Sequence, residues 1–195
     1  MIEPTPRQVH WAVKAFLWAG PVSVVGAVVA LQFMTSSSRA TNERGPGVPL
    51  KTIASAQADF RGNDRDGNRK QDYWRADIAG LYALKPEGAD DAIKLIELSL
   101  AGADAAPTTE IGRTVARAPK AGYWVKALRH ADESPSELDP TRFAAVMYPA
   151  DGTSHRRVYI ISEANTIFAR PWNGPSDTPG VYPADPLKEG WSPLR

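Results

Sequence analysis

The residues between Asn63 and Asp72 have the types and spacing to bind a divalent metal ion. Side chains with oxygen atoms alternate at Asp64, Asp66 and Asn68, and Asp72 closes the run. Calcium takes six to eight oxygen ligands, and an EF-hand loop supplies them from positions 1, 3, 5, 7, 9 and 12. Counted from Asp64, this chain supplies side chains at positions 1, 3, 5 and 9 and a carbonyl at position 7. The pattern predicts a calcium loop formed by Asp64, Asp66, Asn68 and Asp72.

The same loop has features that oppose metal binding. An EF-hand loop has Gly at position 6 and a bidentate Glu at position 12, whereas this chain has Arg69 and Arg75 there. Arg65, Arg69 and Lys70 also bring positive charge close to any bound cation. The alternative is a plain turn in which the carboxylates accept hydrogen bonds from backbone amides. Both interpretations stay open, and a bound calcium ion is expected to be structural.

The sequence offers no recognisable catalytic set. The histidines, His10, His130 and His155, lack the spacing or the neighbouring acid of a zinc site. Ser154 could be combined with His130 and Asp132, but no Gly-x-Ser-x-Gly elbow supports such a triad. Because the chain has no Cys, thiolate catalysis and disulfides are excluded. We predict that the protein is not an enzyme and has no cofactor other than the calcium considered above.

Charge and aromatic residues exclude one class of partner and leave another open. Residues 1–48 carry four basic and two acidic side chains, which leaves nineteen and twenty for residues 49–195. A nearly neutral domain lacks the electrostatic footprint of a nucleic-acid-binding protein, so we predict no nucleic-acid partner. The Trp and Tyr residues could line a groove, although most are expected in the core. Trp172 and Trp191, in Pro-rich segments, are predicted to be the more exposed pair.

The longest apolar stretch, Ala15 to Met34, contains twenty residues without a charge. A helix of that length rises about 30 Å, the thickness of the hydrocarbon core of a bilayer. A cleaved signal peptide is the alternative, but the apolar run exceeds the length typical of one. We therefore predict a single-pass membrane anchor in contact with lipid. The residues assigned to the anchor are Ala15, Trp18, Val24, Val28, Leu31 and Met34.

These patterns divide the chain into three parts. Residues 1–34 form the anchor with its short N-terminal tail, 35–49 a polar Gly/Pro linker, and 50–195 a domain with a Pro-rich C-terminal tail. The fourteen residues before the apolar stretch are expected to stay in the cytoplasm rather than to cross the membrane. The large domain is therefore expected to be extracytoplasmic.

The domain is predicted to combine helices with an antiparallel sheet. Apolar residues recur at helical spacing in 50–61 and again in 90–106, and 75–84 has the length of a short helix. After residue 119, aromatic and β-branched residues indicate strands, and Asn165 suits a tight hairpin. The predicted strands are 121–130, 142–150, 156–163 and 166–170. We expect an α+β fold, with helices packed on a three- to four-stranded antiparallel meander.

This order of elements resembles that of type IV pilins and type II secretion pseudopilins. The segment LKTIASAQADFR, with Leu50, Ile53, Ala56 and Gln57, is similar to the segment that follows the membrane helix in that family. The loop NDRDGNRKQDYWRADIAGLYAL, followed by AGYWVKAL, FAAVMYPA and NTIFAR, looks like planctomycete pilin-like surface proteins of unknown function. The chain departs from the family because the apolar stretch lacks the Glu of the mature pilin helix.

The resemblance implies a pilin-like fold and a membrane-anchored protein that acts in surface assembly or secretion. Its partners would be other proteins or further copies of itself. Some pseudopilins hold calcium in a loop. An anchored calcium- or small-ligand-binding module with no assembly role is the alternative function.

Overall fold

The computed structural model describes residues 45–111, 116–132, 136–152 and 156–194. Contacts divide the chain into two units, Met1–Thr41 and Asn42–Arg195, and the second contains all described residues. Its helices are α2 (Gly47–Gly62), α3 (Gly80–Ala83), α4 (Leu98–Gly102) and the 3-10 helix η1 (Pro175–Asp177). Its strands are β1 (Tyr73–Trp74), β2 (Tyr123–His130), β3 (Leu138–Asp139), β4 (Ala144–Pro149), β5 (Arg157–Ser162), β6 (Phe168–Pro171), β7 (Val181–Tyr182) and β8 (Ser192–Pro193).

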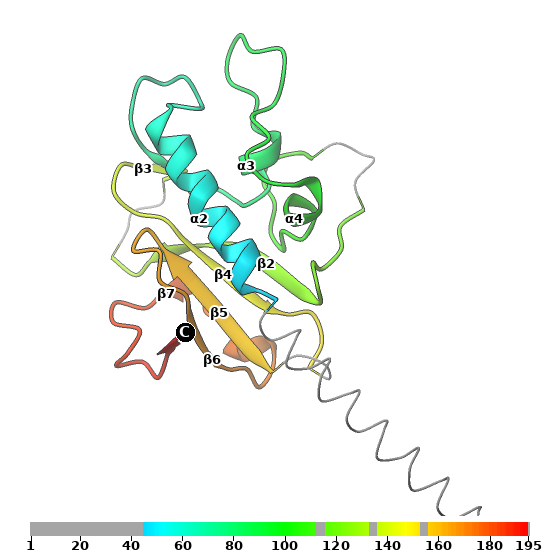
Figure 1. Ribbon diagram of the computed structural model, residues 1–195, viewed down its shortest axis with the longest axis vertical. Helices are drawn as coiled ribbons and strands as arrows, with labels where there is room; N and C mark the ends of the chain where they lie inside the picture. Colours follow the sequence, from blue (N-terminus) through cyan, green and yellow to red (C-terminus); the bar gives the residue numbers. More distant parts are fainter. Residues whose placement is uncertain (1–44, 112–115, 133–135, 153–155, 195) are drawn as a thin grey trace, which may run out of the picture. The chain divides into compact units, whose positions relative to one another are not determined.

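Six of these strands form one sheet in the order β7-β2-β4-β5-β6-β8 (Figure 1). The central strands β2, β4, β5 and β6 pair antiparallel, and β8 joins the edge antiparallel to β6. The other edge strand, β7, lies parallel to β2, so the sheet is mixed. Asn165 has a φ of 56° in the tight turn between β5 and β6, as the sequence predicts for that hairpin.

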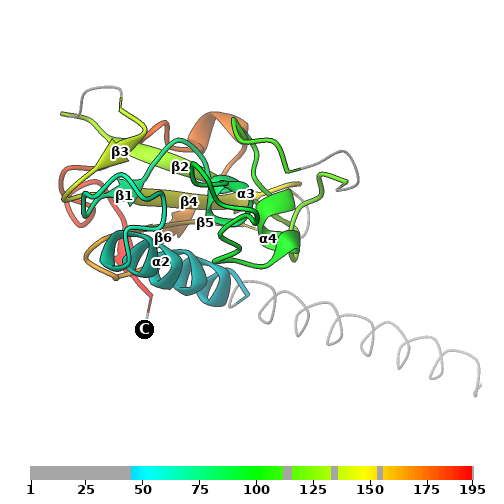
Figure 2. The same cartoon turned by 90° about the horizontal axis from the view of Figure 1, so that it is seen from above.

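Helix α2 covers one face of the sheet, as the edge-on view shows (Figure 2). Its apolar residues Leu50, Ile53 and Phe60 are spaced to share one side and are almost completely buried. They pack with every second residue of β4, Ala145 and Met147, which point to this face. The helix begins earlier than the predicted 50–61. Pro49 is tolerated in its first turn, because an N–H at that position would have no acceptor within the helix.

The opposite face of the sheet is covered by the chain after β6 rather than by a helix. The alternate residues Val146, Val158 and Ile160 point to this face and are fully buried. Trp172, Tyr182 and Trp191 pack over them. Tyr182 belongs to β7, the edge strand parallel to β2, and Trp191 follows β7 in the chain. The prediction that Trp172 and Trp191 are the more exposed pair is therefore wrong, since they are 7% and 3% exposed.

The predicted α+β fold of helices on a three- to four-stranded meander is wrong. The described residues are mostly β, with a six-stranded mixed sheet curled like half a barrel and a second small sheet of β1 and β3. Among these residues only α2 is a long helix. The segment 90–106 is helical only at α4 (Leu98–Gly102), because Ile93, Lys94 and Leu95 donate their amides to carbonyls in α3 and directly after it. Lys94 also has a φ of 49°, which ends any helix there.

The predicted single-pass membrane localisation, with its extracytoplasmic domain, is also corrected. Within the described ranges, no helix is long and apolar enough to cross a membrane. The residues assigned to the anchor, from Ala15 to Met34, lie outside the described residues.

Candidate functional site

The predicted metal loop lies between the end of α2 and the start of β1, at the rim of the domain. Its first acid, Asp64, accepts the backbone N–H of Arg69 at 3.0 Å and 3.2 Å through its two carboxylate oxygens. Arg69 has a φ of 64°, in the left-handed region that favours glycine. The backbone at position 6 therefore has the conformation that Gly gives an EF-hand loop, although the side chain is that of Arg.

The next three predicted ligands contact one another. Asn68 Nδ2 donates to Asp66 Oδ2 at 2.8 Å and to Asp72 Oδ2 at 3.3 Å. A single amide nitrogen thus lies between two carboxylates and supplies the positive dipole that both need. Asn68 Oδ1 accepts the N–H of Lys70 at 2.7 Å, which fixes the amide in this orientation.

Asp72 is the least usual member of the loop. Its residue is 5% exposed, and no group in the described part of the chain donates a hydrogen bond to its buried Oδ1. A buried carboxylate oxygen without a donor costs about 1 to 3 kcal/mol or more. Burial raises the pKa of Asp66 above its ordinary value, and the charges of Asp72 and Asp64 act in the same direction. The three carboxylates are therefore close enough to repel one another.

The basic residues oppose a cation less than the sequence suggests. Arg65 turns away from the loop and pairs with Asp59 at 2.6 Å. Arg75, at position 12, is 4% exposed and pairs with Asp139 at 2.8 Å. Arg69 is exposed at the rim.

No group of three or more His, Cys, Asp or Glu side chains in the described residues is already arranged to hold a metal ion. The loop brings Asp66, Asn68 and Asp72 together and leaves Asp64 turned to a backbone amide. Calcium binding by the loop thus stays a prediction, and it requires these side chains to rotate.

Two further acidic residues, Asp77 and Asp104, hold the chain just beyond β1, and the sequence does not single them out. Asp77 accepts hydrogen bonds from Trp74 Nε1 at 3.0 Å and from the N–H groups of Gly80, Thr108 and Thr109. Burial acts to raise the pKa of Asp77, but these donors outweigh it and the pKa is lowered. The spacing Trp74-x-x-Asp77-x-x-Gly80 is the only sequence signal of this network.

Asp104 completes the pair and has the opposite electrostatic outcome. Its Oδ2 accepts the N–H groups of Ile78 and Ala79 at 2.7 Å and 2.9 Å. Burial nevertheless raises the pKa of Asp104, and the charge of Asp77 adds to this effect. Because several backbone donors surround each carboxylate, the pair is best explained as a structural support.

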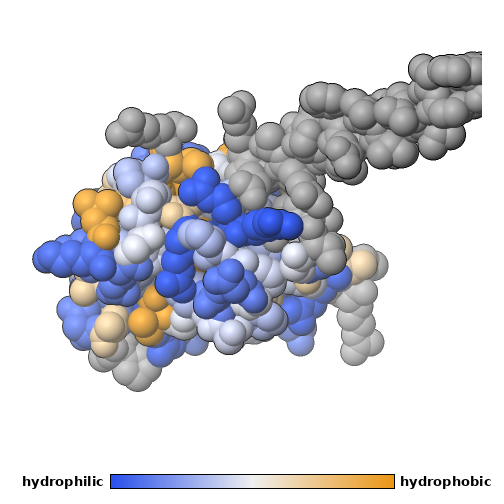
Figure 3. Space-filling model, turned by 90° about the horizontal axis from the view of Figure 1, so that it is seen from below, coloured by the Kyte–Doolittle hydropathy of each residue, from blue (hydrophilic) through white to orange (hydrophobic). Residues whose placement is uncertain are grey.

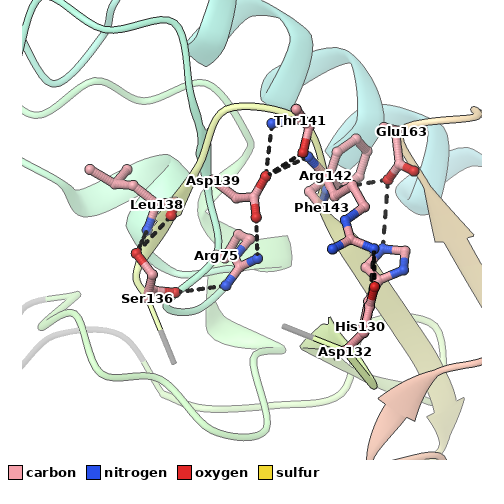
Figure 4. Close-up of polar contacts among 10 residues, drawn as sticks. All are labelled: Arg75, His130, Asp132, Ser136, Leu138, Asp139, Thr141, Arg142, Phe143 and Glu163. Atoms are coloured by element: carbon pink, nitrogen blue, oxygen red, sulfur yellow. Dashed lines mark hydrogen bonds and ion pairs between the residues drawn. The ribbon is translucent and has the colours of Figure 1, made fainter. Parts of the chain in front are cut away.

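The candidate catalytic residues are not brought into a triad by the described structure. His130, at the end of β2, lies 3.7 Å from Glu163 through its Nε2 atom (Figure 4). Asp132 is exposed and pairs with Arg142 at 3.0 Å. Ser154, His155 and His10 lie outside the described residues.

An apolar depression opens beside the first turn of α2. It has a volume of about 580 Å³, and Val48 at its edge is 73% exposed. Lys51 crosses its rim and donates to Asn165. The lining residues are Gly47, Val48, Lys51, Thr52, Ser55, Ile167 and Leu194. Figure 3 shows the domain from below relative to Figure 1; that face is largely hydrophilic, with separate small apolar patches.

Comparisons with protein-family models, with characterised proteins and with solved structures find no match for this chain.

Proposed function

We propose that the protein is a calcium-binding module whose site is the loop from Asp64 to Asp72. The observation that carries this proposal is the buried Asp72 Oδ1 atom, which no described group satisfies, beside the carboxylate of Asp66. A divalent cation would supply the missing partner and neutralise the repulsion between the carboxylates, which adds to burial in raising the pKa of Asp66.

The ion would take the place now held by Asn68 Nδ2, between Asp66 and Asp72. A half-turn of the amide would present Asn68 Oδ1 to the cation as a fourth side-chain oxygen, beside the carboxylates of Asp66, Asp72 and an inward-rotated Asp64. The hydrogen bond from the Lys70 N–H to Asn68 Oδ1 would be lost as a result. Oxygen-only donors in a flexible loop suit calcium better than magnesium, which demands near-ideal octahedral geometry and gives up water reluctantly.

The expected affinity is low. The loop has no acid at position 12, and Arg69 and Lys70 are exposed beside it. We therefore expect a dissociation constant on the order of 10⁻⁴ to 10⁻³ M, the weak end of the range for calcium loops.

Isothermal titration of the full chain with CaCl₂ tests the proposal, with MgCl₂ as the comparison. Saturable binding of one calcium ion, at least tenfold weaker for magnesium, is the expected result. Asp72→Asn should abolish binding, whereas Asp90→Asn, an exposed acid outside the loop, should leave it unchanged. Absence of calcium binding up to 10 mM, a concentration about tenfold above the weakest dissociation constant expected, would refute the proposal.

A second candidate function is assembly with further copies of this chain, through the apolar depression beside α2. It is supported by the 73% exposure of Val48 at the edge of the depression. Sedimentation velocity across a concentration series tests it: Val48→Asp should shift the distribution toward monomer. Leu187→Asp is the matched control, since Leu187 is 63% exposed but does not line the depression. Equal behaviour of wild type and Val48→Asp would count against assembly.

A further inference from the structure

The metal loop is joined to the domain through β1, which begins directly after Asp72. Gln57 of α2 is 2% exposed and holds β1 from one side. Its Oε1 accepts the N–H of Trp74 at 3.1 Å, and its Nε2 donates to the Trp74 carbonyl at 2.5 Å. The Trp74 indole donates to Asp77. A displacement of Asp72 would therefore act on a strand whose next residues are fixed on several sides.

On its other side β1 pairs with β3, and Arg75 strengthens that pairing. Tyr73 lies opposite Asp139 in the antiparallel register. The Arg75 N–H donates to the Glu137 carbonyl at 2.7 Å. Its guanidinium donates to Asp139 Oδ2 at 2.8 Å and to the Ser136 carbonyl at 3.0 Å (Figure 4). Arg75, three residues beyond Asp72, thus gathers three groups of the 136–139 segment.

Asp139, which binds Arg75, also binds the residues that lead into β4. Its Oδ1 accepts the N–H groups of Thr141 and Arg142, each at 2.8 Å. Burial acts to raise the pKa of Asp139, but these two amides, the Thr141 hydroxyl and the Arg75 charge outweigh it and lower the pKa. We call residues 139–142 the Asp139 turn. One carboxylate therefore holds both Arg75 and this turn.

We propose that calcium in the loop orders the β1–β3 sheet and the Asp139 turn through Arg75. This inference rests on the calcium binding proposed above. An ion that binds Asp72 fixes the residue directly before β1, so Arg75 can leave Asp139 only when the ion is released. The loop thereby controls a segment more than sixty residues away in the chain, as the Arg75–Asp139 contact spans 64 positions.

Amide hydrogen exchange of the full chain, with and without CaCl₂, measures this coupling. If opening of an amide requires release of the ion, its exchange slows by a factor of 1 + [Ca²⁺]/Kd, about elevenfold at ten times Kd. We expect this slowing at Arg75, Thr141 and Arg142. Trp191, whose N–H donates to the Pro186 carbonyl in a turn outside these contacts, should exchange at an unchanged rate.

Two variants separate coupling from general stabilisation. Asp139→Asn removes the charge that holds Arg75, so calcium should still bind while the slowing at Thr141 and Arg142 disappears. Arg75→Lys, which keeps the charge but loses the forked geometry, should reduce that slowing and provides the test if Asp139→Asn does not fold. Asp132→Asn, which removes only the exposed partner of Arg142, should retain it.

The outcomes distinguish the two proposals. Calcium binding by titration without slower exchange at Thr141 and Arg142 would overturn the coupling and leave calcium binding intact. Equal slowing at Trp191 would also overturn it, because the effect would then be global. Absence of calcium binding would remove both proposals together.

Discussion

Gly80 allows a direct test of how tightly β1 is packed on the rest of the domain. A Cβ atom at this position would lie 2.2 Å from Trp74 Nε1 and 2.8 Å from Asp77 Oδ1, well inside contact distance. The Trp74 ring cannot move freely, because its N–H donates to Asp77 and the ring, 8% exposed, packs with Phe60 at 6.2 Å between centroids. Gly80→Ala must therefore displace the indole or the helix start.

The size of the effect follows from three terms. Overpacking of a filled core costs about 1 to 3 kcal/mol, and loss of the Trp74–Asp77 hydrogen bond adds about 1 kcal/mol. Alanine in place of glycine in a helix returns about 1 kcal/mol. We expect Gly80→Ala to lower the free energy of unfolding by about 1 to 3 kcal/mol overall, measured by urea unfolding followed by tryptophan fluorescence.

Gly62→Ala is the matched control, since it lies at the end of α2 and a Cβ there would meet nothing within 4 Å. It should raise stability by about 0.5 to 1 kcal/mol. If Gly80→Ala were as stable as Gly62→Ala, with an unchanged emission spectrum in the folded state, the packing argument for Trp74 would be refuted.

Three further predictions concern the loop and its supports. Asp66→Asn should not destabilise the calcium-free protein, because it removes repulsion between carboxylates. In thermal melts at a calcium concentration of ten times Kd, wild type should gain about 1.4 kcal/mol in free energy of unfolding and the variant should not; equal gains in the two proteins would contradict this. Asp77 has a lowered pKa in the folded protein. The stability that its charge contributes is therefore present above the unfolded pKa of about 3.8 and is lost as the pH falls through the folded pKa. The difference in free energy of unfolding between wild type and Asp77→Asn, measured with urea, should shrink below the unfolded pKa, and a difference that stays constant with pH would contradict this. Gln57→Leu should cost about 2 to 4 kcal/mol in urea unfolding, because it leaves two backbone groups of Trp74 without partners, and a loss below 1 kcal/mol would show that other groups replace Gln57.

Local patterns predicted those elements that depend on neighbouring residues. Aromatic and β-branched residues placed β2, β4, β5 and β6 to within a few residues, and Asn165 marked the hairpin turn. The helical spacing of Leu50, Ile53 and Phe60 placed α2. Each of these signals is carried by a side chain that responds mainly to its own segment.

Features that depend on distant segments could not be predicted in the same way. β7 and β8 are two residues long, and their pairing with β2 and β6 follows from a chain path that no short pattern encodes. The segment 90–106 has helical spacing, but only Leu98–Gly102 forms a helix, because the amides of residues 93–95 donate to carbonyls in α3 and directly after it. These two differences account for much of the error in fold class.

The candidate site was predicted in its residues but not in its environment. The alternation of Asp64, Asp66 and Asn68 is visible in the sequence, and so is Arg65. The burial of Asp72 and the turning of Arg65 toward Asp59 depend on tertiary packing. The sequence therefore overstated the positive charge around the loop and gave no sign of the unsatisfied oxygen.

The covering of the second sheet face by the chain after β6 also has a consequence for the order in which the domain folds. Val158 and Ile160 are shielded by Trp191, which lies more than thirty positions later in the sequence. Leu194 donates its N–H to the carbonyl of Ile167, the residue directly before β6, and so continues the pairing of β8 with β6. This face therefore stays open to solvent until the chain as far as Trp191 has folded back over β5, so its burial has to wait for contacts between distant segments.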